Sequence, residues 1–246
     1  MTQPDIAERF DTGSWEFTPE VAGVFPEHVR ASVPFYDEIQ DLVAEAADWL
    51  VPAGGLVADL GAATGATAER IQRRHPDRGI RFALYDESQA MLDRARAVLA
   101  EMSCGDKAAL HAARIQDPPL KHTDADLTLA LFTLQFLPMQ DRVSALRMAR
   151  LCSSPTGALI IAEKTRPTDS RWAEISIDVS HDWKAGHGVS DAAIRAKARA
   201  LRGVLIPYPQ EATIAMIKSA GWVAPEILFR WHAWTVIGAF ASAAGL

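Results

Sequence analysis

One stretch constrains the fold of this chain more than any other: Leu56-Val57-Ala58-Asp59-Leu60-Gly61-Ala62-Ala63-Thr64-Gly65. It begins with a short apolar run, which is typical of a strand buried on both faces. The run then breaks into small residues, and an amphipathic helix pattern begins at Ala66. A strand, a glycine turn and a helix in this order form the opening unit of nucleotide-binding α/β proteins. Gly61 permits the tight turn, and the small residues that follow let a ligand approach bare backbone: Ala62, Ala63 and Gly65.

Two acidic side chains accompany this turn. Asp86 ends the next predicted strand and lies 21 positions after Gly65. An acidic side chain in this place can accept hydrogen bonds from both ribose hydroxyls of a nucleotide. Asp59 lies inside the first strand, where a carboxylate is costly to bury without partners. We therefore expect Asp59 to order the turn or to contact the ligand.

Strand and helix patterns alternate from residue 56 onward. Further strands are expected near 80–85, 108–113, 126–131, 158–162, 226–231 and 235–239, and helices near 66–75, 88–102, 140–151 and 209–220. This alternation predicts an α/β fold with a mostly parallel seven-stranded sheet and helices on both faces. We expect one domain, 1–246, in which a helix at 35–51 precedes the first strand. A proline-rich lid or dimer segment is expected at 1–35, and a helical insertion at about 167–206.

Composition excludes several kinds of protein. The 246 residues are 49% apolar and 23% charged, as in an ordinary globular domain. The formal charge of −6 argues against nucleic acid as the main partner. No apolar run reaches the roughly 18 residues of a membrane span, and the N-terminus lacks a signal-peptide pattern. The two cysteines form neither a disulfide framework nor a metal-ligand spacing. We expect a cytoplasmic protein without a metal.

The turn sequence resembles a known first motif. The dinucleotide fingerprint G-x-G-x-x-G is absent. Asp59-Leu60-Gly61-x-x-Thr64-Gly65 is instead similar to the first motif of class I S-adenosylmethionine (SAM) dependent methyltransferases, which have a Rossmann-like fold. Ala63 stands where that family usually has glycine.

A closer resemblance covers about Phe17 to Ala239. It is carried by the segments 21–26, 30–36, 132–137, 163–164 and 181–184, which read VAGVFP, RASVPFY, FTLQFL, EK and HDWK. Together they resemble the carboxy-S-adenosylmethionine synthases, which use SAM and prephenate to make a carboxylated SAM for tRNA wobble-uridine modification. The resemblance implies a homodimer. It also implies that SAM contacts the residues matching Tyr36, Gly61, Ala62, Ala63, Asp86 and Ile115.

Position along the sheet adds further candidates, because ligands of such sheets bind at the carboxyl ends of the strands. We expect Asp86 and Glu87 to face ribose and adenine, and Arg114 and Ile115 to lie beside adenine. Leu131 and Phe132 are expected beneath the methionine part of SAM and near the substrate. For Ile115 and Leu131, core packing is the alternative.

Three departures from the family fall in the expected site. Leu131 replaces an asparagine that helps hold the cofactor, and Arg114 replaces an aspartate. Ala198 replaces the arginine that pairs with the added carboxylate of carboxy-SAM, and alanine cannot take over that role. Arg195 and Arg202 share a helical face with Ala198, and the sequence leaves open whether either one turns inward. Arg199 completes the expected substrate residues.

Three functions remain open. The first is a small-molecule methyltransferase, with Tyr36, His181 and Asp182 as candidate general bases. The second is SAM chemistry without a methyl acceptor: carboxy-SAM synthesis from prephenate, or self-displacement that releases methylthioadenosine. The third is a non-catalytic SAM-binding module. SAM is the expected cofactor, with S-adenosylhomocysteine or methylthioadenosine as its product. Because Ala198 offers no charge, we expect no efficient carboxy-SAM synthesis.

Overall fold

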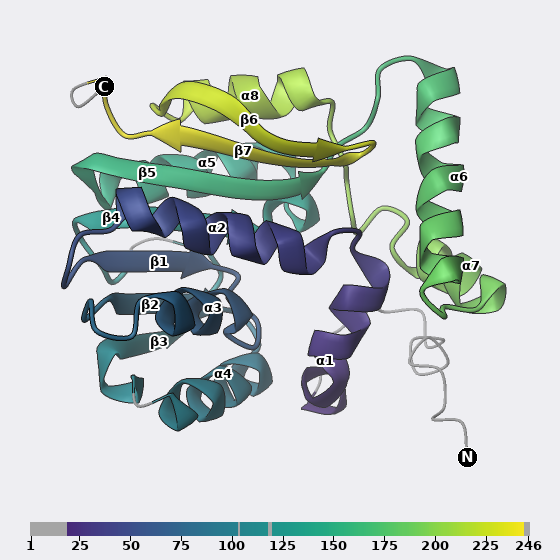
Figure 1. Cartoon of the computed structure of the whole chain (residues 1–246). Coiled ribbons are helices and arrows are strands. Elements are labelled where there is room, and N and C mark those ends of the chain that lie inside the picture. The colour runs from purple at the N-terminus through teal and green to yellow at the C-terminus, as the bar shows by residue number, and fades with distance from the viewer. Residues whose placement is uncertain (1–18, 103, 118–119, 244–246) are drawn as a thin grey trace.

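Seven strands form one sheet, and helices cover both of its faces (Figure 1). The computed structural model describes residues 19–102, 104–117 and 120–243. Its strands are β1 (Leu56–Leu60), β2 (Arg81–Asp86), β3 (Ala108–Ala112), β4 (Ala125–Leu131), β5 (Ser153–Lys164), β6 (Val223–Trp231) and β7 (Trp234–Phe240). Its α-helices are α1 (Pro19–Ser32), α2 (Tyr36–Leu50), α3 (Ala66–Arg74), α4 (Gln89–Glu101), α5 (Met139–Leu151), α6 (Ser170–Gly186), α7 (Asp191–Ala200) and α8 (Gln210–Ser219). Short 3-10 helices lie at Gly105–Lys107 (η2) and Leu134–Phe136 (η3). None of the described helices is long and apolar enough to cross a membrane.

The strand order is β3-β2-β1-β4-β5-β7-β6. The strands β1 to β5 pair in parallel, whereas β7 is antiparallel to both β5 and β6. Helical crossovers return most of the parallel strands in the same direction, and a tight hairpin joins β6 to β7, where Trp231 pairs with Trp234. The α/β architecture predicted from the sequence is confirmed.

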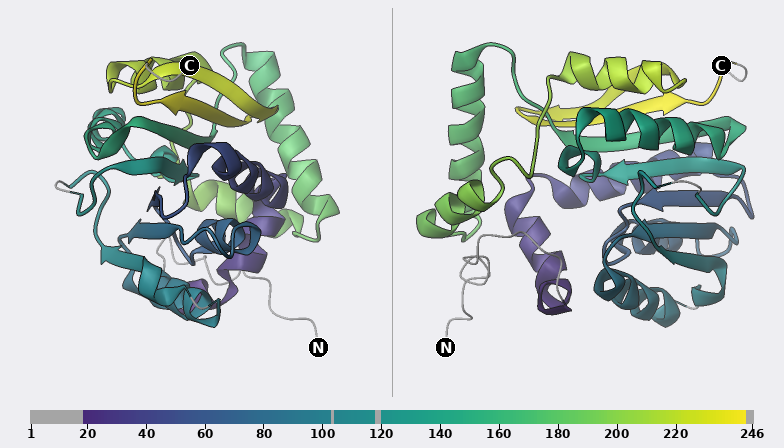
Figure 2. Two further views of the ribbon diagram at one scale, coloured as in Figure 1. Left: turned by 60° about the vertical axis from the view of Figure 1, so that its left-hand side comes forward. Right: turned by 180° about the vertical axis from the view of Figure 1, so that it is seen from behind.

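Apolar side chains alternate between the two faces of the central strands. In β1, Leu56, Ala58 and Leu60 belong to the core under α5 and α8. Val57, between them, belongs to the core under α2, α3 and α4. The two helical layers are seen from opposite sides in Figure 1 and in the right-hand view of Figure 2. This burial on both faces explains why β1 is apolar throughout rather than alternating.

The helices α1, α6 and α7 lie beyond the carboxyl edge of the parallel strands (Figure 1). Near its start, Val21 of α1 packs against Met91 of α4. Near its end, Val29 and Val33 pack against Trp234 at the start of β7. The helix therefore crosses the edge of the sheet where a ligand would bind.

The N-terminal segment is more regular than expected. The prolines favour short helices and turns, but α1 continues through Pro26. Proline removes one helical hydrogen bond, and the apolar contacts on both sides of it hold the helix together. Residues 1–18 of the expected lid segment lie outside the described residues.

The fifth strand is longer than the predicted 158–162 because β5 begins at Ser153 and pairs with both β4 and β7. Gly157 makes this possible, since a Cβ there would lie 2.6 Å from the carbonyl oxygen of Ala125. The expected insertion contains the two helices α6 and α7.

Candidate cofactor and substrate site

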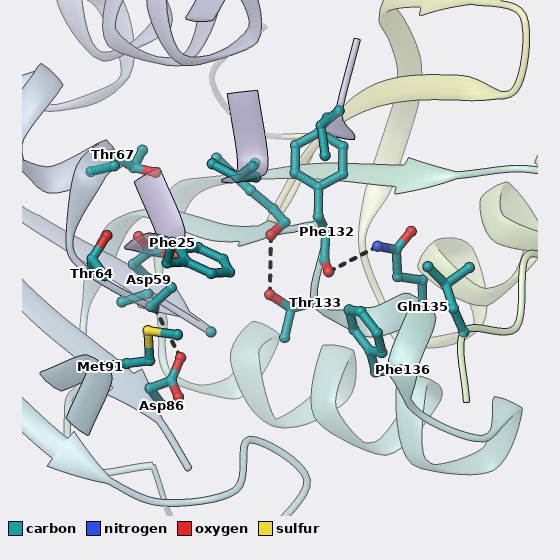
Figure 3. Close-up of a pocket in the computed structure, with 18 of the residues that line it drawn as sticks. Phe25, Asp59, Thr64, Thr67, Asp86, Met91, Phe132, Thr133, Gln135 and Phe136 are labelled. Carbon is teal, nitrogen blue, oxygen red and sulfur yellow. Dashed lines mark hydrogen bonds between the residues drawn. The ribbon is translucent and has the colours of Figure 1, made fainter. Parts of the chain in front are cut away.

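One cavity lies at the carboxyl edge of the sheet, where β1, β2 and β4 end (Figure 3). The cavity brings together the expected cofactor residues from five separate segments. They are Tyr36, Asp59, Gly61, Ala62, Ala63, Asp86, Glu87, Arg114, Ile115 and Leu131. The expected substrate residue Phe132 also lines it. Ile115 and Leu131 line the cavity and also pack against the core, so the two alternatives considered for them, a cofactor contact and core packing, do not exclude each other.

The turn after β1 presents bare backbone to this cavity. Gly61 has φ 89°, and a Cβ at this position would collide with the side chain of Thr133. Ala63 has φ 46°, which is left-handed backbone and strained for alanine. The Oδ2 of Asp86 accepts a 2.9 Å hydrogen bond from the backbone N–H of Ala63. The end of β2 thereby holds the turn in its strained shape.

The end of the cavity next to β1 and β2 is lined by the carboxylates of Asp59 and Asp86. Burial, and then the charge of Asp86, raise the pKa of Asp59 to about 7. Burial raises the pKa of Asp86 too, although hydrogen bonds from the backbone of Ser88 and Ala63 oppose the rise. Burial, followed by the charge of Asp59, raises the pKa of Tyr36, so its hydroxyl stays protonated at neutral pH. These groups favour a cation next to Asp59.

Two buried polar atoms lining the cavity lack a hydrogen-bond partner among the described residues. One is the Oε1 of Gln40, an acceptor on the buried face of α2. The other is the Nε1 of Trp234, a donor on a side chain that is 4% exposed. Buried polar groups are nearly always paired. An acceptor and a donor left open here indicate a polar ligand.

Gln135, in η3, ties the loop after β4 to the end of β5. Its Nε2 donates to the carbonyl oxygen of Phe132 at 3.1 Å, and its Oε1 accepts from the backbone N–H of Lys164 at 2.9 Å. Phe132 has φ 59°, so its backbone is also strained. Figure 3 shows Phe132 and Gln135 across the cavity from Asp59 and Asp86. Gln135 therefore positions the wall opposite the motif turn.

Lysines form the other end of the cavity. Lys164 ends β5, Lys184 belongs to α6, and Lys197 belongs to α7. The Nζ of Lys197 lies 2.7 Å from the Nε2 of His28 and donates to the Oγ of Ser32 at 2.9 Å. Burial, and then the charges of Lys184 and Lys164, hold the pKa of Lys197 well below its usual range. The cavity is thus acidic at the β1–β2 end and basic at the α6–α7 end.

Six expected site residues do not line this cavity: Gly65, His181, Asp182, Arg195, Ala198 and Arg199. Gly65 caps α3 with φ 78°, and a Cβ there would lie 3.0 Å from that of Ala95, so it serves helix packing. His181 is half-buried, and burial, followed by the charges of Lys184 and Lys164, lowers its pKa. Asp182 is exposed.

On α7, the residue that faces the cavity is Lys197. Arg195, Ala198, Arg199 and Arg202 are exposed, so neither arginine considered as a replacement turns inward. Lys197 precedes Ala198 by one position, which rotates its side chain by about 100° around the helix axis. On this helix it is therefore Lys197 that lines the cavity, and not the expected Arg195, Ala198 or Arg199.

Sequence reasoning missed Gln40, Gln135, His28 and the three lysines. The signal was present for some of them, because Gln135, Lys164 and Lys184 lie within the segments that carry the family resemblance. Gln40 lies on the buried face of a helix, where the periodicity expects an apolar residue. A polar residue on such a face is the sign that could have identified it.

The residues of this cavity fit SAM. Gly61 lines the cavity with backbone alone, and the acceptor oxygens of Asp86 lie at the end of the second strand, where ribose binds in such folds. Gln40 Oε1 offers a buried acceptor for an ammonium group, and Asp59 adds negative charge. A cationic nucleoside with an amino-acid tail matches this set of groups.

Comparisons with known proteins identify the family of this chain. A family profile described as "Methyltransferase domain" matches residues 57–157. A carboxy-S-adenosyl-L-methionine synthase from Shewanella amazonensis is 34% identical over 219 residues, which cover 89% of each chain. Another, from Klebsiella pneumoniae, is 30% identical over 218 residues, covering 89% of this chain and 87% of its own.

Solved structures show the same fold at low identity. An O-methyltransferase family protein from Burkholderia thailandensis matches with a TM-score of 0.65 at 17% identity, covering 98% of this chain and 64% of its own length. The family profile, the curated relatives and this fold together identify a SAM-dependent transferase. With relatives of this identity along nearly its full length, the chain belongs to the carboxy-S-adenosyl-L-methionine synthase family, on a class I SAM-dependent methyltransferase scaffold.

Proposed function

We propose that this protein binds SAM at the acidic end of the cavity and transfers its methyl group to a small molecule held at the other end. The observation that supports this most is the continuity of the cavity. The turn after β1 and the lysines of β5, α6 and α7 line one space, so two small molecules can meet inside it. Bringing two reactants into contact in line is most of what such a transfer needs.

Each end of SAM has a proposed partner. Asp86 accepts hydrogen bonds from the ribose hydroxyls, while Glu87, Arg114 and Ile115 surround the adenine. Gln40 and Asp59 hold the ammonium group, and Leu131 and Phe132 lie beneath the methionine chain. When bound, SAM supplies an electrophilic methyl group on a sulfonium. Helix α1 excludes water from it, because it packs from Met91 to Trp234 across the cavity.

Tyr36 acts in this proposal as a hydrogen-bond donor rather than as a base. Burial, and then the charge of Asp59, raise its pKa, so a proton is hard to remove. His181 and Asp182 lie outside the cavity lining and are not retained as bases. Groups inside the cavity that can take a proton near neutral pH are Asp59 and Lys184, with pKa values of about 7 and about 8.

A second candidate is carboxy-SAM synthesis, which is the activity named for the relatives. Lys197 is the observation in its favour, because its side chain lines the cavity from the helix on which Ala198 stands in place of the family's arginine. Arg114 and Leu131, by contrast, still depart from the family.

One experiment separates the candidates. The purified protein is incubated with SAM alone, with SAM and prephenate, and with SAM and a panel of small acceptors, and the products are followed by mass spectrometry. S-adenosylhomocysteine formed only with an acceptor supports methyl transfer. SAM heavier by a carboxyl group selects the second candidate. Methylthioadenosine from SAM alone indicates self-displacement, and no product under any condition supports a non-catalytic SAM-binding module.

We also propose a cytoplasmic homodimer whose segment 1–35 acts as a lid. The thiols of Cys104 and Cys152 are not joined in a disulfide, as expected in a reducing compartment. Helix α6 exposes Trp172, Ile175 and Ile177, which suit a subunit contact. Gel filtration with light scattering measures the oligomeric state.

A further inference from the structure

We propose that Arg142 is a positioning residue that fixes two walls of the cavity relative to each other. The first wall is the segment 132–137, which follows β4, and the second wall is the segment 201–206, which follows α7. Arg142 belongs to α5 and lies behind both walls rather than in the cavity lining. The inference rests on the proposed function, because it names the group that shapes the cavity next to the methionine part of SAM.

The side chain of Arg142 reaches both walls. It is 2% exposed, although arginine is rarely buried without partners. Its Nε donates to the carbonyl oxygen of Leu137 at 2.7 Å, and its Nη2 donates to that of Gln135 at 3.0 Å. The same Nη2 donates to the carbonyl oxygen of Ile206 at 2.6 Å, and Ile206 lies 64 positions further along the chain than Arg142. One guanidinium therefore joins two segments that are distant in the sequence.

The two walls also contact each other at this point. The backbone N–H of Ile206 donates to the carbonyl oxygen of Gln135 at 2.8 Å. A carbonyl oxygen has two lone pairs, so that of Gln135 can accept from Ile206 and from Arg142 together. The central carbon of the guanidinium lies 4.5 Å from the centre of the Tyr208 ring, two residues beyond the second wall. Arg142 thus holds the first wall and the chain around Ile206 in one arrangement.

Each joined residue is connected to the surface of the cavity. Gln135 holds the carbonyl oxygen of Phe132 through its side chain, as Figure 3 shows. Strained backbone, such as the left-handed φ of Phe132, persists only where the surrounding structure holds it. On the second wall, Leu205 lines the cavity and directly precedes Ile206. A shift of the guanidinium therefore moves both surfaces that a ligand meets.

Glu163 is the charged partner of Arg142. Its Oε2 lies 3.9 Å from the Nη1 of Arg142, and both side chains are almost fully buried. Burial raises the pKa of Glu163, while the charge of Arg142 and a backbone hydrogen bond from Leu134 oppose the rise. In the described part of the chain, the Oε1 of Glu163 finds no hydrogen-bond partner. The desolvation of a buried ion pair offsets much of its attraction, so this pair suits a positioning role better than a stabilising one.

Packing alone does not explain Arg142. Methionine would fill a similar volume in the core, but it has no N–H to donate to the three carbonyl oxygens. Lysine has three donors but lacks the planar fork that serves carbonyl oxygens on two segments at once. Replacing a purely structural arginine would lower only the stability of the protein. Replacing a positioning arginine would also lower ligand affinity in a protein that stays folded.

The test uses the full-length protein and the double variant that combines Arg142→Met with Glu163→Gln. This variant removes both charges together, so no buried charge is left unpaired. Arg142→Lys is the conservative variant, and Arg147→Met is the matched control, because Arg147 is exposed on the same helix. Titration calorimetry measures the affinity for S-adenosylhomocysteine and for methylthioadenosine, which lacks the amino-acid tail. A thermal melt measures stability, and hydrogen exchange follows the backbone of both walls in ligand-free protein.

If Arg142 positions the walls, the double variant melts cooperatively and loses about tenfold or more in affinity for S-adenosylhomocysteine, because the hydrogen bonds of its charged tail lose their alignment. The affinity for methylthioadenosine is unchanged, since Asp86 lies at the other end of the cavity (Figure 3). Hydrogen exchange becomes faster in both walls. Arg142→Lys recovers part of the lost affinity, and Arg147→Met resembles the wild type in every measurement.

Other results overturn the proposal. An equal loss of affinity for both nucleosides shows a structural role only, and so does a lower melting temperature with unchanged affinities. Faster exchange in only one wall shows that Arg142 does not join the two.

Two further outcomes still decide the question. If the double variant does not fold, Arg142→Lys replaces it, because it keeps a charge opposite Glu163, and it should lose affinity for S-adenosylhomocysteine alone. If the wild type binds neither nucleoside, the proposed function fails on its own. Hydrogen exchange in the ligand-free variants then shows whether Arg142 joins the two walls.

Discussion

The carboxylate of Asp86 and the backbone of Ala63 are joined by a hydrogen bond of 2.9 Å between two elements of the nucleotide site. Ala63 occupies left-handed backbone with φ 46°, a conformation that glycine adopts more readily than alanine. The other oxygen of Asp86 accepts from the N–H of Ser88, which begins the next helix. Asp86 therefore shapes the turn that lines the cavity.

Asp86→Ala should weaken S-adenosylhomocysteine binding by at least about tenfold, because each hydrogen bond to a charged acceptor contributes about 1.5–3 kcal/mol. Asp86→Asn should lose less, since its remaining oxygen can still accept from Ala63. Asp126→Asn is the matched control, because Asp126 accepts from the backbone N–H of Leu56 at the far end of β1. Titration calorimetry that finds equal affinity in folded Asp86→Ala contradicts the ribose assignment.

Ala63→Gly should leave the protein equally stable or stabilise it by up to about 1 kcal/mol. Glycine relieves the left-handed strain of about 1–2 kcal/mol, and its greater freedom in the unfolded chain offsets part of that gain. Ala68→Gly in α3 is the comparison, and it should destabilise by about 1 kcal/mol or more. Urea unfolding measures both changes. Equal losses in the two variants would show that Ala63 carries no strain.

Asp59→Asn should change how binding and stability depend on pH. The pKa of Asp59 is about 7, so its charge, which attracts the sulfonium and ammonium of SAM, is present only above that pH. SAM affinity should therefore rise between pH 6 and pH 8 in the wild type and stay flat in the variant.

The folding stability of the wild type should fall with rising pH, whereas its SAM affinity rises. Because the pKa of Asp59 is higher in the folded state than in the unfolded chain, folding takes up a proton between about pH 4 and pH 7. The stabilisation is complete below pH 4 and is lost as the pH rises through 7. Asp59→Asn should then unfold at a higher temperature than wild type at pH 8. A lower melting temperature there means that the ionised carboxylate has a partner.

Tyr36→Phe should weaken SAM binding or slow turnover without disturbing the fold. The ring packs with its centre 6.3 Å from that of Phe132, and phenylalanine preserves this contact. Only the protonated hydroxyl is lost, which is the group proposed to donate to the ligand. Calorimetry and a thermal melt distinguish the two effects. Wild-type affinity and rate in the variant would assign Tyr36 to packing alone.

Incubation with SAM and prephenate should give little or no carboxy-SAM. The resemblance implies that Ala198 stands where the family has the arginine that pairs with the added carboxylate, and a lysine of the cavity lacks both the bidentate geometry and the fixed charge of a guanidinium. Ala198 is exposed and lies outside the cavity lining. If a long side chain from this position reaches the cavity, Ala198→Arg gains carboxy-SAM by mass spectrometry, whereas the control Ala192→Arg on the same helix does not. Robust turnover by the wild type would select carboxy-SAM synthesis as the function, and Lys197→Met would then test whether that lysine replaces the arginine.

The local pattern of the sequence was enough to predict the sheet and one end of its site. An apolar run, a glycine turn and an amphipathic helix have few alternatives, because the backbone must satisfy its own hydrogen bonds in the core. The spacing from Gly65 to Asp86 places the acid at the end of the neighbouring strand, since β1 and β2 pair in parallel register. These features depend on residues close together in the chain.

Only the tertiary structure decided which face of α7 meets the cavity. The helical period groups Arg195, Ala198 and Arg202, but it does not fix the rotation of the helix about its axis. Packing against α1 and α6 sets that rotation, and it turns Lys197 toward His28 and Ser32. This contact joins residues more than 160 positions apart, and Lys197 thereby lines the cavity. A sequence pattern does not encode that orientation, because it depends on how separate elements pack against one another.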